Sequence, residues 1–260
     1  MDAWDYINKH KYDKAYKQFS RELQKSEDYL TYAGRFTASL CLGWLDRAEA
    51  DIQRAQALAT EECKKYKVRS SNYAEDIAMV QWLKGEKNRA VEGWVSVMEG
   101  IRKGEIEFAD MAGGVQPGAL VWFAGVYMKN DELVEKAKKY LAKLAGRSRI
   151  EYWPGPVAKH ILGKMGEQDV LDEAITRDED IVDFDRKGRP KPRPPIMKDP
   201  RVKRKLCQAN FYIGISRLAR GDREGYAESL RACTKIPMPI ELEYFLARGE
   251  LEKVGEKVKR

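Results

Sequence analysis

The chain has 260 residues, of which 43% are hydrophobic and 34% charged, with a formal net charge of +7 at pH 7 and a pI of about 9.0. The hydrophobic share is enough for a continuous core, but no window approaches the roughly 18 apolar residues that a membrane-spanning helix requires. The 48 Lys and Arg residues are offset by 41 Asp and Glu residues, which is typical of a solvated surface and disfavours a nucleic-acid-binding protein.

Helical periodicity continues along nearly the whole chain, and no segment shows convincing strand alternation. In chain order it predicts helices over residues 13–24, 28–42, 73–84, 88–102, 119–128, 131–145 and 157–162. The segment 119–128 is apolar on all sides, which predicts a central helix that its neighbours cover.

Three units repeat one spacing, in which a turn position is followed by Ala five residues later and by a bulky apolar residue four further on. A small residue at a helix crossing lets the two backbones approach, and the bulky residue fills the next gap. The first two turn positions lie 33 residues apart, which predicts helical hairpins with a period near 34 residues. The units are His10, Ala15 and Phe19; Gly43, Ala48 and Ile52; and Gly85, Ala90 and Trp94.

These hairpins predict an all-α fold in which residues 1–260 form a single helical-repeat domain. We expect a right-handed α-solenoid of about six stacked hairpins, which offers a curved surface to a partner. Residues 176–200 interrupt the pattern with an acidic block followed by a basic block rich in proline. Because proline lacks an amide donor and restricts the residue before it, we expect an exposed insertion loop between two hairpins.

Candidate catalytic and ligand-binding motifs are sparse. His160 paired with Cys207 would supply a base and a nucleophile, but no local signature supports the pair, so a structural histidine is favoured. Gly113, Gly114 and Gly118 lack the Lys-Ser/Thr of a phosphate loop, which favours a helix break. The acidic block around Asp183 could bind a cation, but its spacing is irregular and favours a solvated run. We therefore expect no enzyme, no cofactor and no metal.

The four cysteines are widely separated and form no CxxC pair, which favours buried thiols in a reducing compartment. The first residues, from Met1 to Asp5, lack the basic and apolar regions of a signal peptide. The expected location is therefore the cytoplasm, with no contact to a membrane.

The repeated units resemble the tetratricopeptide repeat family, well over residues 3–103, weakly over 119–175 and again over 207–237. The C-terminal half is similar to that of bacterial tetratricopeptide proteins, among them lipoprotein adaptors of a periplasmic protease and immunity partners of secreted toxins. The chain departs from the adaptors because it lacks a lipoprotein signal and carries the basic insertion. The resemblance rests on Trp153-Pro154-Gly155-Pro156, Ile161-Leu162-Gly163, residues 207–214 and residues 218–222.

The resemblance implies a bacterial protein that binds another protein, and the favoured hypothesis is an immunity protein that occludes a toxin domain. One alternative is an adaptor or chaperone that holds extended peptides in its groove. A further alternative is nucleic-acid binding through the basic insertion, although this block lacks aromatic residues for base stacking. The predicted partner-binding residues are Tyr6, Lys9, Tyr16, Arg35, Arg47, Arg189, Lys191 and Arg193.

Overall fold

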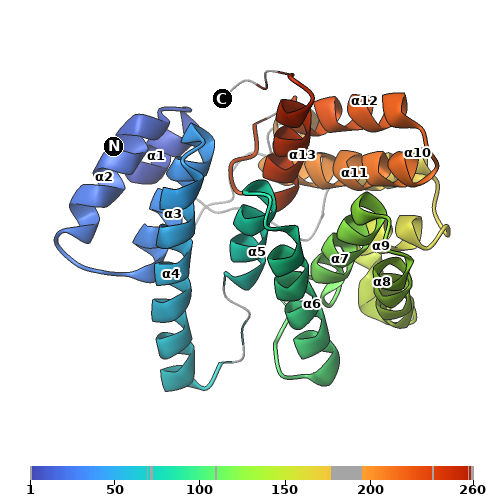
Figure 1. The fold of residues 1–260 in the computed structure, drawn as a ribbon, viewed down its shortest axis with the longest axis horizontal. Helices are drawn as coiled ribbons and strands as arrows, with labels where there is room; N and C mark the ends of the chain where they lie inside the picture. The colour runs from blue at the N-terminus through green and yellow to red at the C-terminus, as the bar shows by residue number, and fades with distance from the viewer. Residues whose placement is uncertain are drawn as a thin grey trace.

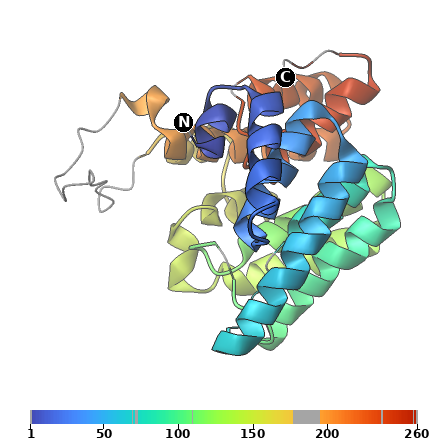
Figure 2. The ribbon, with the colours of Figure 1, turned by 90° about the vertical axis from the view of Figure 1, so that its left-hand side faces the viewer.

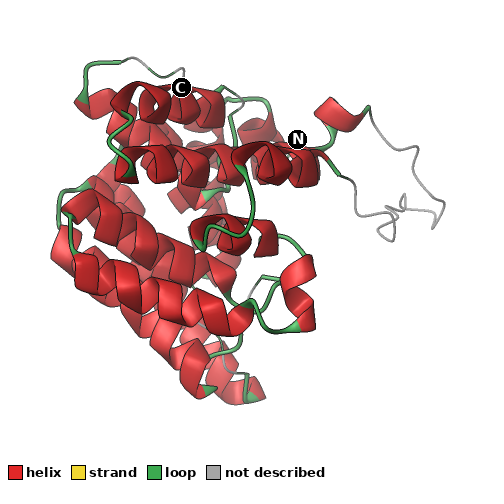
Figure 3. Cartoon of the chain, turned by 90° about the vertical axis from the view of Figure 1, so that its right-hand side faces the viewer, coloured by secondary structure: helices red, strands yellow, loops and turns green. Residues whose placement is uncertain are grey.

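The computed structural model describes residues 2–68, 70, 73–108, 110–176, 195–235, 237–256 and 258. The all-α prediction is confirmed for these residues, whose only contact of the β type is an isolated bridge between Ser70 and Glu107 (Figure 3). The α-helices are α1 (Ala3–Asn8), α2 (Tyr12–Leu23), α3 (Tyr29–Leu42), α4 (Leu45–Tyr66), α5 (Ala74–Leu83), α6 (Lys87–Lys103), α7 (Val115–Met128), α8 (Asp131–Leu144), α9 (Gly155–Ile161), α10 (Glu167–Ile175), α11 (Pro200–Ala219), α12 (Arg223–Thr234) and α13 (Leu242–Lys253). Two short 3-10 helices, η1 (Ser148–Glu151) and η2 (Ile196–Lys198), complete the set.

Short turns reverse the chain at the three predicted turn positions. Gly43 between α3 and α4 has a φ of 79°, and Gly85 between α5 and α6 has a φ of 88°, conformations that glycine adopts without a Cβ penalty. His10 takes the same left-handed conformation between α1 and α2, with a φ of 54°. Its ring is exposed, and its Nδ1 lies 2.7 Å from the hydroxyl of Tyr12.

The three alanines of the repeated spacing lie in tight helix contacts, as predicted. Ala15, Ala48 and Ala90 are all 0% exposed, and the bulky residues four positions after them are at most 2% exposed. Each helix packs against its neighbours in sequence, and α11 also packs against α7 and α9. The main hydrophobic core extends from Ala3 in α1 to Leu251 in α13.

Two helices are buried on nearly all sides. The prediction of a covered, apolar helix over 119–128 is confirmed by α7, in which residues 117–125 are all buried. The second such helix, α13, is absent from the predicted elements. It packs against α5, α11 and α12, and the guanidinium of Arg248 donates a hydrogen bond of 3.4 Å to the carbonyl of Cys41 in α3. In Figure 1, α13 lies beside α5 and α11.

Most of the predicted insertion, residues 177–194, lies outside the described residues. Both ends of the insertion lie near the start of α11. The carbonyl of Thr176 at one end accepts a hydrogen bond of 3.2 Å from the ammonium of Lys205 in α11, and the other end leads directly into this helix. In Figure 2 these ends lie on the same side as the connection from α8 to α9. None of the helices in the described ranges has the length and apolar character needed to cross a membrane.

Candidate functional site

Three of the predicted partner-binding residues meet where α2, α3 and α4 join. Arg35 forms an ion pair with Asp51, with Nη2 and Oδ1 2.6 Å apart, and its guanidinium lies 5.6 Å from the ring centre of Tyr16. Arg47 lies over two rings, 4.5 Å from Trp44 and 5.8 Å from Tyr16. Arg35 and Tyr16 therefore help to join the first two hairpins, whereas Arg47 is exposed at the surface.

The other predicted residues do not belong to this cluster of rings and guanidinium groups. Tyr6 is half-buried against the core, and Lys9 is exposed at the end of α1. Arg189, Lys191 and Arg193 fall outside the described residues, and their part in binding stays a prediction.

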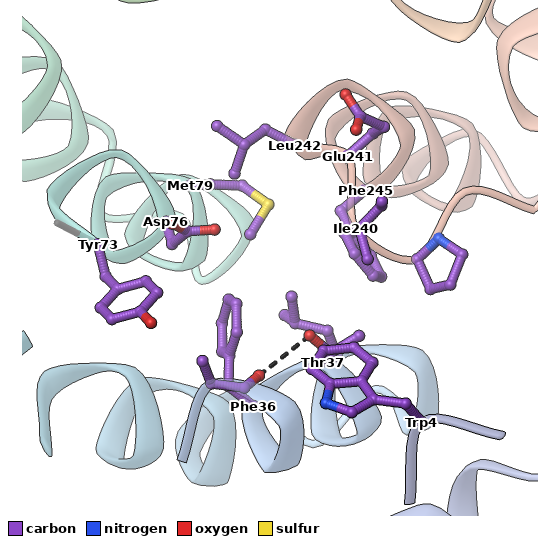
Figure 4. Close-up of a pocket in the computed structure, with 13 residues that line it drawn as sticks. Trp4, Phe36, Thr37, Tyr73, Asp76, Met79, Ile240, Glu241, Leu242 and Phe245 are labelled. Carbon is purple, nitrogen blue, oxygen red and sulfur yellow. Dashed lines mark hydrogen bonds between the residues drawn. The ribbon is translucent and has the colours of Figure 1, made fainter. Parts of the chain in front are cut away.

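A recess opens between α1, α3, α5 and the segment that leads into α13 (Figure 4). Its solvent-accessible volume is about 110 Å³, and its walls are mostly apolar or aromatic, with Phe36 and Phe245 on opposite sides. Trp4 and Ile240 also line it, and they are 41% and 61% exposed, so two large apolar side chains are accessible at its mouth.

Asp76 is the charged side chain that points into this recess (Figure 4). It lies in the first turn of α5, where the helix dipole favours negative charge. Around the carboxylate, however, the recess is lined by Met79, Phe36 and Leu242. Burial raises the pKa of Asp76 to about 7, and the hydrogen bond of the carboxylate to its own backbone amide opposes this shift only in part. Among the described residues the carboxylate has no cationic partner.

A group of buried carboxylates lies at the start of α13. Glu243 is 0% exposed, and its Oε1 accepts hydrogen bonds from the hydroxyl of Tyr212 at 3.0 Å and from the amide of Gln116 at 3.3 Å. Its Oε2 has no hydrogen-bond partner. Burial is the main cause that raises the pKa of Glu243, so this carboxyl is held in its neutral form over a wider pH range.

Two further carboxylates belong to the same group. Glu241 is 2% exposed, with its Oε1 at 2.7 Å from Nε of Arg204 and its Oε2 accepting from the amide of Gln208 at 2.9 Å. Burial raises the pKa of Glu241 and of Glu75 to about 8, and the charge of Asp76 adds to the effect on Glu75. In the described part of the chain, Arg204 is the cation that pairs with this group, so the region is short of positive charge.

The exposed large apolar side chains lie mainly at or beside the connections between successive hairpins. The connections that precede α3, α5, α7, α9, α11 and α13 each carry such a residue at or beside them. Figure 1 shows the connections that follow α4 and α6 along its lower side. Val254 is the exception among the described residues. We call this set the apolar edge: Trp4, Leu30, Tyr66, Val68, Phe108, Met111, Tyr152, Ile175, Ile196, Met197 and Ile240.

The structure separates the two residues of the weakly supported catalytic pair. His160 Nδ1 donates to the carbonyl of Met165 at 3.1 Å, so its Nε2 accepts from the hydroxyl of Ser216 at 2.8 Å. Cys207 lies instead beside Cys233, with their Sγ atoms 3.3 Å apart. A pairing of His160 with Cys207 is therefore wrong, and burial lowers the pKa of His160, as expected for a neutral structural histidine.

The glycine-rich segment before α7 also has a structural role. The amide of Gly114 and that of Gln116 donate to the carboxylate of Asp110, at 2.8 and 3.0 Å. The carbonyl of Gly114 accepts from the hydroxyl of Tyr140 at 2.8 Å. The carboxylate of Asp110 thus accepts hydrogen bonds from the backbone amides that a phosphate-binding loop would offer to its ligand. No cluster of three or more metal-ligating side chains is present in the described ranges, and the acidic block around Asp183 lies outside them.

No protein-family model matches the chain, and no curated protein matches it.

Sequence reasoning missed the recess because its parts come from distant segments. Trp4, Asp76 and Ile240 lie far apart in the sequence and belong to no shared motif, and Asp76 resembles an ordinary charged residue at a helix start. The one available signal was the apolar segment after it, from Ile77 to Leu83, which predicts that the start of this helix is close to the core.

Proposed function

We propose that this protein is a non-catalytic helical-repeat protein, a right-handed α-solenoid of about six hairpins, that binds another protein through its apolar edge. The observation that carries the proposal is the distribution of exposed apolar side chains. Scattered exposed hydrophobic residues are normal on any surface, but their concentration at the connections between successive hairpins favours an interaction surface. Tyr66, Met111 and Tyr152 are 62%, 57% and 55% exposed along this edge.

The position of α13 favours a folded partner over an extended peptide. An adaptor that holds peptides along the inner helices needs an open groove there, whereas α13 packs against α5 and α11 on that side. Within the protein-binding class we propose a cytoplasmic bacterial immunity protein, with the resemblance of the C-terminal half to such proteins as its support. A toxin domain would then be occluded sterically at the apolar edge.

The test measures the affinity for the product of the adjacent gene. In the variant Tyr66→Ser/Met111→Ser/Tyr152→Ser, we expect the complex to weaken at least about tenfold, because aromatic anchors at an interface often contribute 2 kcal/mol or more. Val254→Ser is the matched control, since Val254 is 72% exposed but lies at the other end of α13. Its affinity should equal that of the wild type.

Two results would contradict the proposal. Equal affinity of the triple variant and the wild type would exclude the apolar edge as the binding surface. A neighbouring gene product that does not bind would remove the immunity hypothesis, and many hits on an array of short peptides would then favour the adaptor. Nucleic-acid binding through residues 186–205 stays a separate prediction, tested by salt dependence and by deletion of this segment.

A further inference from the structure

We propose that the recess in Figure 4 is a binding site for a lysine or arginine side chain of the partner protein, with Asp76 as its counter-ion. This inference rests on the proposed function and names the chemistry that the partner would present. It concerns a different observation from the apolar edge, namely a carboxylate that has no cationic partner among the described residues and lies in a mostly apolar recess.

The shape and polarity of the recess match an amphipathic cation. Lysine and arginine carry an apolar stem that packs against hydrophobic surface while the charged head seeks a polar partner. In the recess, Phe36, Met79 and Leu242 provide apolar walls, and the carboxylate of Asp76 lies between them. Trp4 at the mouth offers a ring face, on which a guanidinium or ammonium group packs favourably.

The surroundings of Asp76 leave its charge uncompensated. Apolar surroundings make a carboxylate costly to ionise, and Asp76 has no cationic partner among the described residues to offset that cost. Here the charged neighbours are themselves acidic: Glu75 is beside Asp76 on α5, and Glu241 lines the same recess from the segment before α13. A ligand cation would supply the missing positive charge.

The titratable groups around the site give the proposal a pH signature. Tyr73, at the N-cap of α5, and Glu75, in its first turn, interact electrostatically with Asp76. Glu241 lines the recess from the segment before α13, with its carboxylate turned away from the recess and toward Arg204 (Figure 4). With the pKa of Asp76 raised to about 7, part of the population is protonated at neutral pH. Binding of a cation therefore requires release of a proton, and affinity rises as the pH rises through 7.

The experiment measures binding of pentylammonium and butylguanidinium, which mimic the two side chains, by calorimetry and through the change in tryptophan fluorescence that Trp4→Phe should reduce. We expect saturable binding by the wild type that is about thirtyfold tighter at pH 8 than at pH 5.5, from the ionised fractions of a carboxyl with a pKa of about 7. Asp76→Asn, which keeps the shape, should lose at least about tenfold in affinity for both cations. Asp13→Asn, on an exposed part of α2, should leave it unchanged.

Pentanol separates a cation site from a merely apolar one. Equal binding of pentanol and pentylammonium, or equal binding of the cation by the wild type and Asp76→Asn, would overturn the inference. Calorimetry of the wild type in two buffers of different ionisation enthalpy measures proton release without any variant, and no release at pH 7 would also overturn it.

The outcomes for this site and for the proposed function are distinguishable. A partner that binds Asp76→Asn as tightly as the wild type, but loses affinity for the triple variant of the apolar edge, would refute the cation site and leave the proposed function standing. If the protein binds pentylammonium but no protein partner is found, the cation site would stand and the proposed function would be refuted.

Discussion

The smallest features that shape this molecule are alanines at helix crossings. Ala48 is 0% exposed within α4, and Ile52 one turn later is also 0% exposed, so a larger side chain would not fit at either position without displacing its neighbours. The spacing of these residues could be predicted from the sequence because it reflects local geometry. The environment of Asp76 could not, because it depends on Trp4 and Ile240, which come from the two ends of the chain.

Substitution of Ala48 by leucine tests the crossing directly. Overpacking a tight core contact costs about 1–3 kcal/mol, so we expect Ala48→Leu to lower the free energy of unfolding by this amount in urea titrations. Ala50→Leu is the matched control on the same helix, because Ala50 is exposed and surface substitutions usually stay within about 0.5 kcal/mol. Equal effects of the two substitutions would mean that Ala48 does not lie at a close crossing.

Among the helices, α7 and α13 show what a sequence reveals about burial and what it hides. The residues of α7 are apolar on every side, so its central position follows from the pattern alone. In α13 the buried residues include Glu243, Arg248 and Glu250, which look like surface charges in the sequence. The contacts of Glu243 with Tyr212 and of Arg248 with Cys41 come from the fold, which explains why no pattern predicted this helix.

Shortening one buried side chain of α13 measures how much the packing of this helix contributes to the free energy of unfolding. Leu246 is 0% exposed, and removal of buried leucine methyl groups costs about 2–5 kcal/mol, so Leu246→Ala should lower the unfolding free energy by an amount in this range. Leu30→Ala is the control, because Leu30 is 59% exposed at the start of α3. A loss below about 1 kcal/mol for Leu246→Ala would contradict the central position of α13.

At the scale of the whole molecule, the buried carboxylates set the pH dependence of stability. The pKa of Glu75 and Glu241 is raised from 4.5 to about 8, and that of Asp76 from 3.8 to about 7. At a pH between the ordinary and the raised pKa of these carboxyls, the folded state binds more protons than the unfolded state. Stability therefore falls as the pH rises from about 5 to 8, the opposite of the trend for carboxylates in ion pairs.

Thermal unfolding across this pH range checks the sign of the effect. Glu75→Gln removes a carboxylate whose Oε1 has no partner, so at pH 8.5 we expect a gain of roughly 1–3 kcal/mol over the wild type and little difference at pH 5. Glu61→Gln, at an exposed position on α4, is the control. A wild-type stability that rises steadily from pH 5 to 8 would show that these carboxyls are ionised in the folded protein.

The place of α13 has a consequence for biosynthesis. Every helix that it contacts is translated before it, so the ribosome exposes the apolar faces of α3, α5 and α11 before their cover exists. Long chains with such transiently uncovered surface are prone to aggregate or to need chaperones during synthesis. A nascent chain stalled before residue 242 should therefore be captured by chaperones and cut readily by protease, and synthesis of the twelve residues of α13 would convert it into a resistant form.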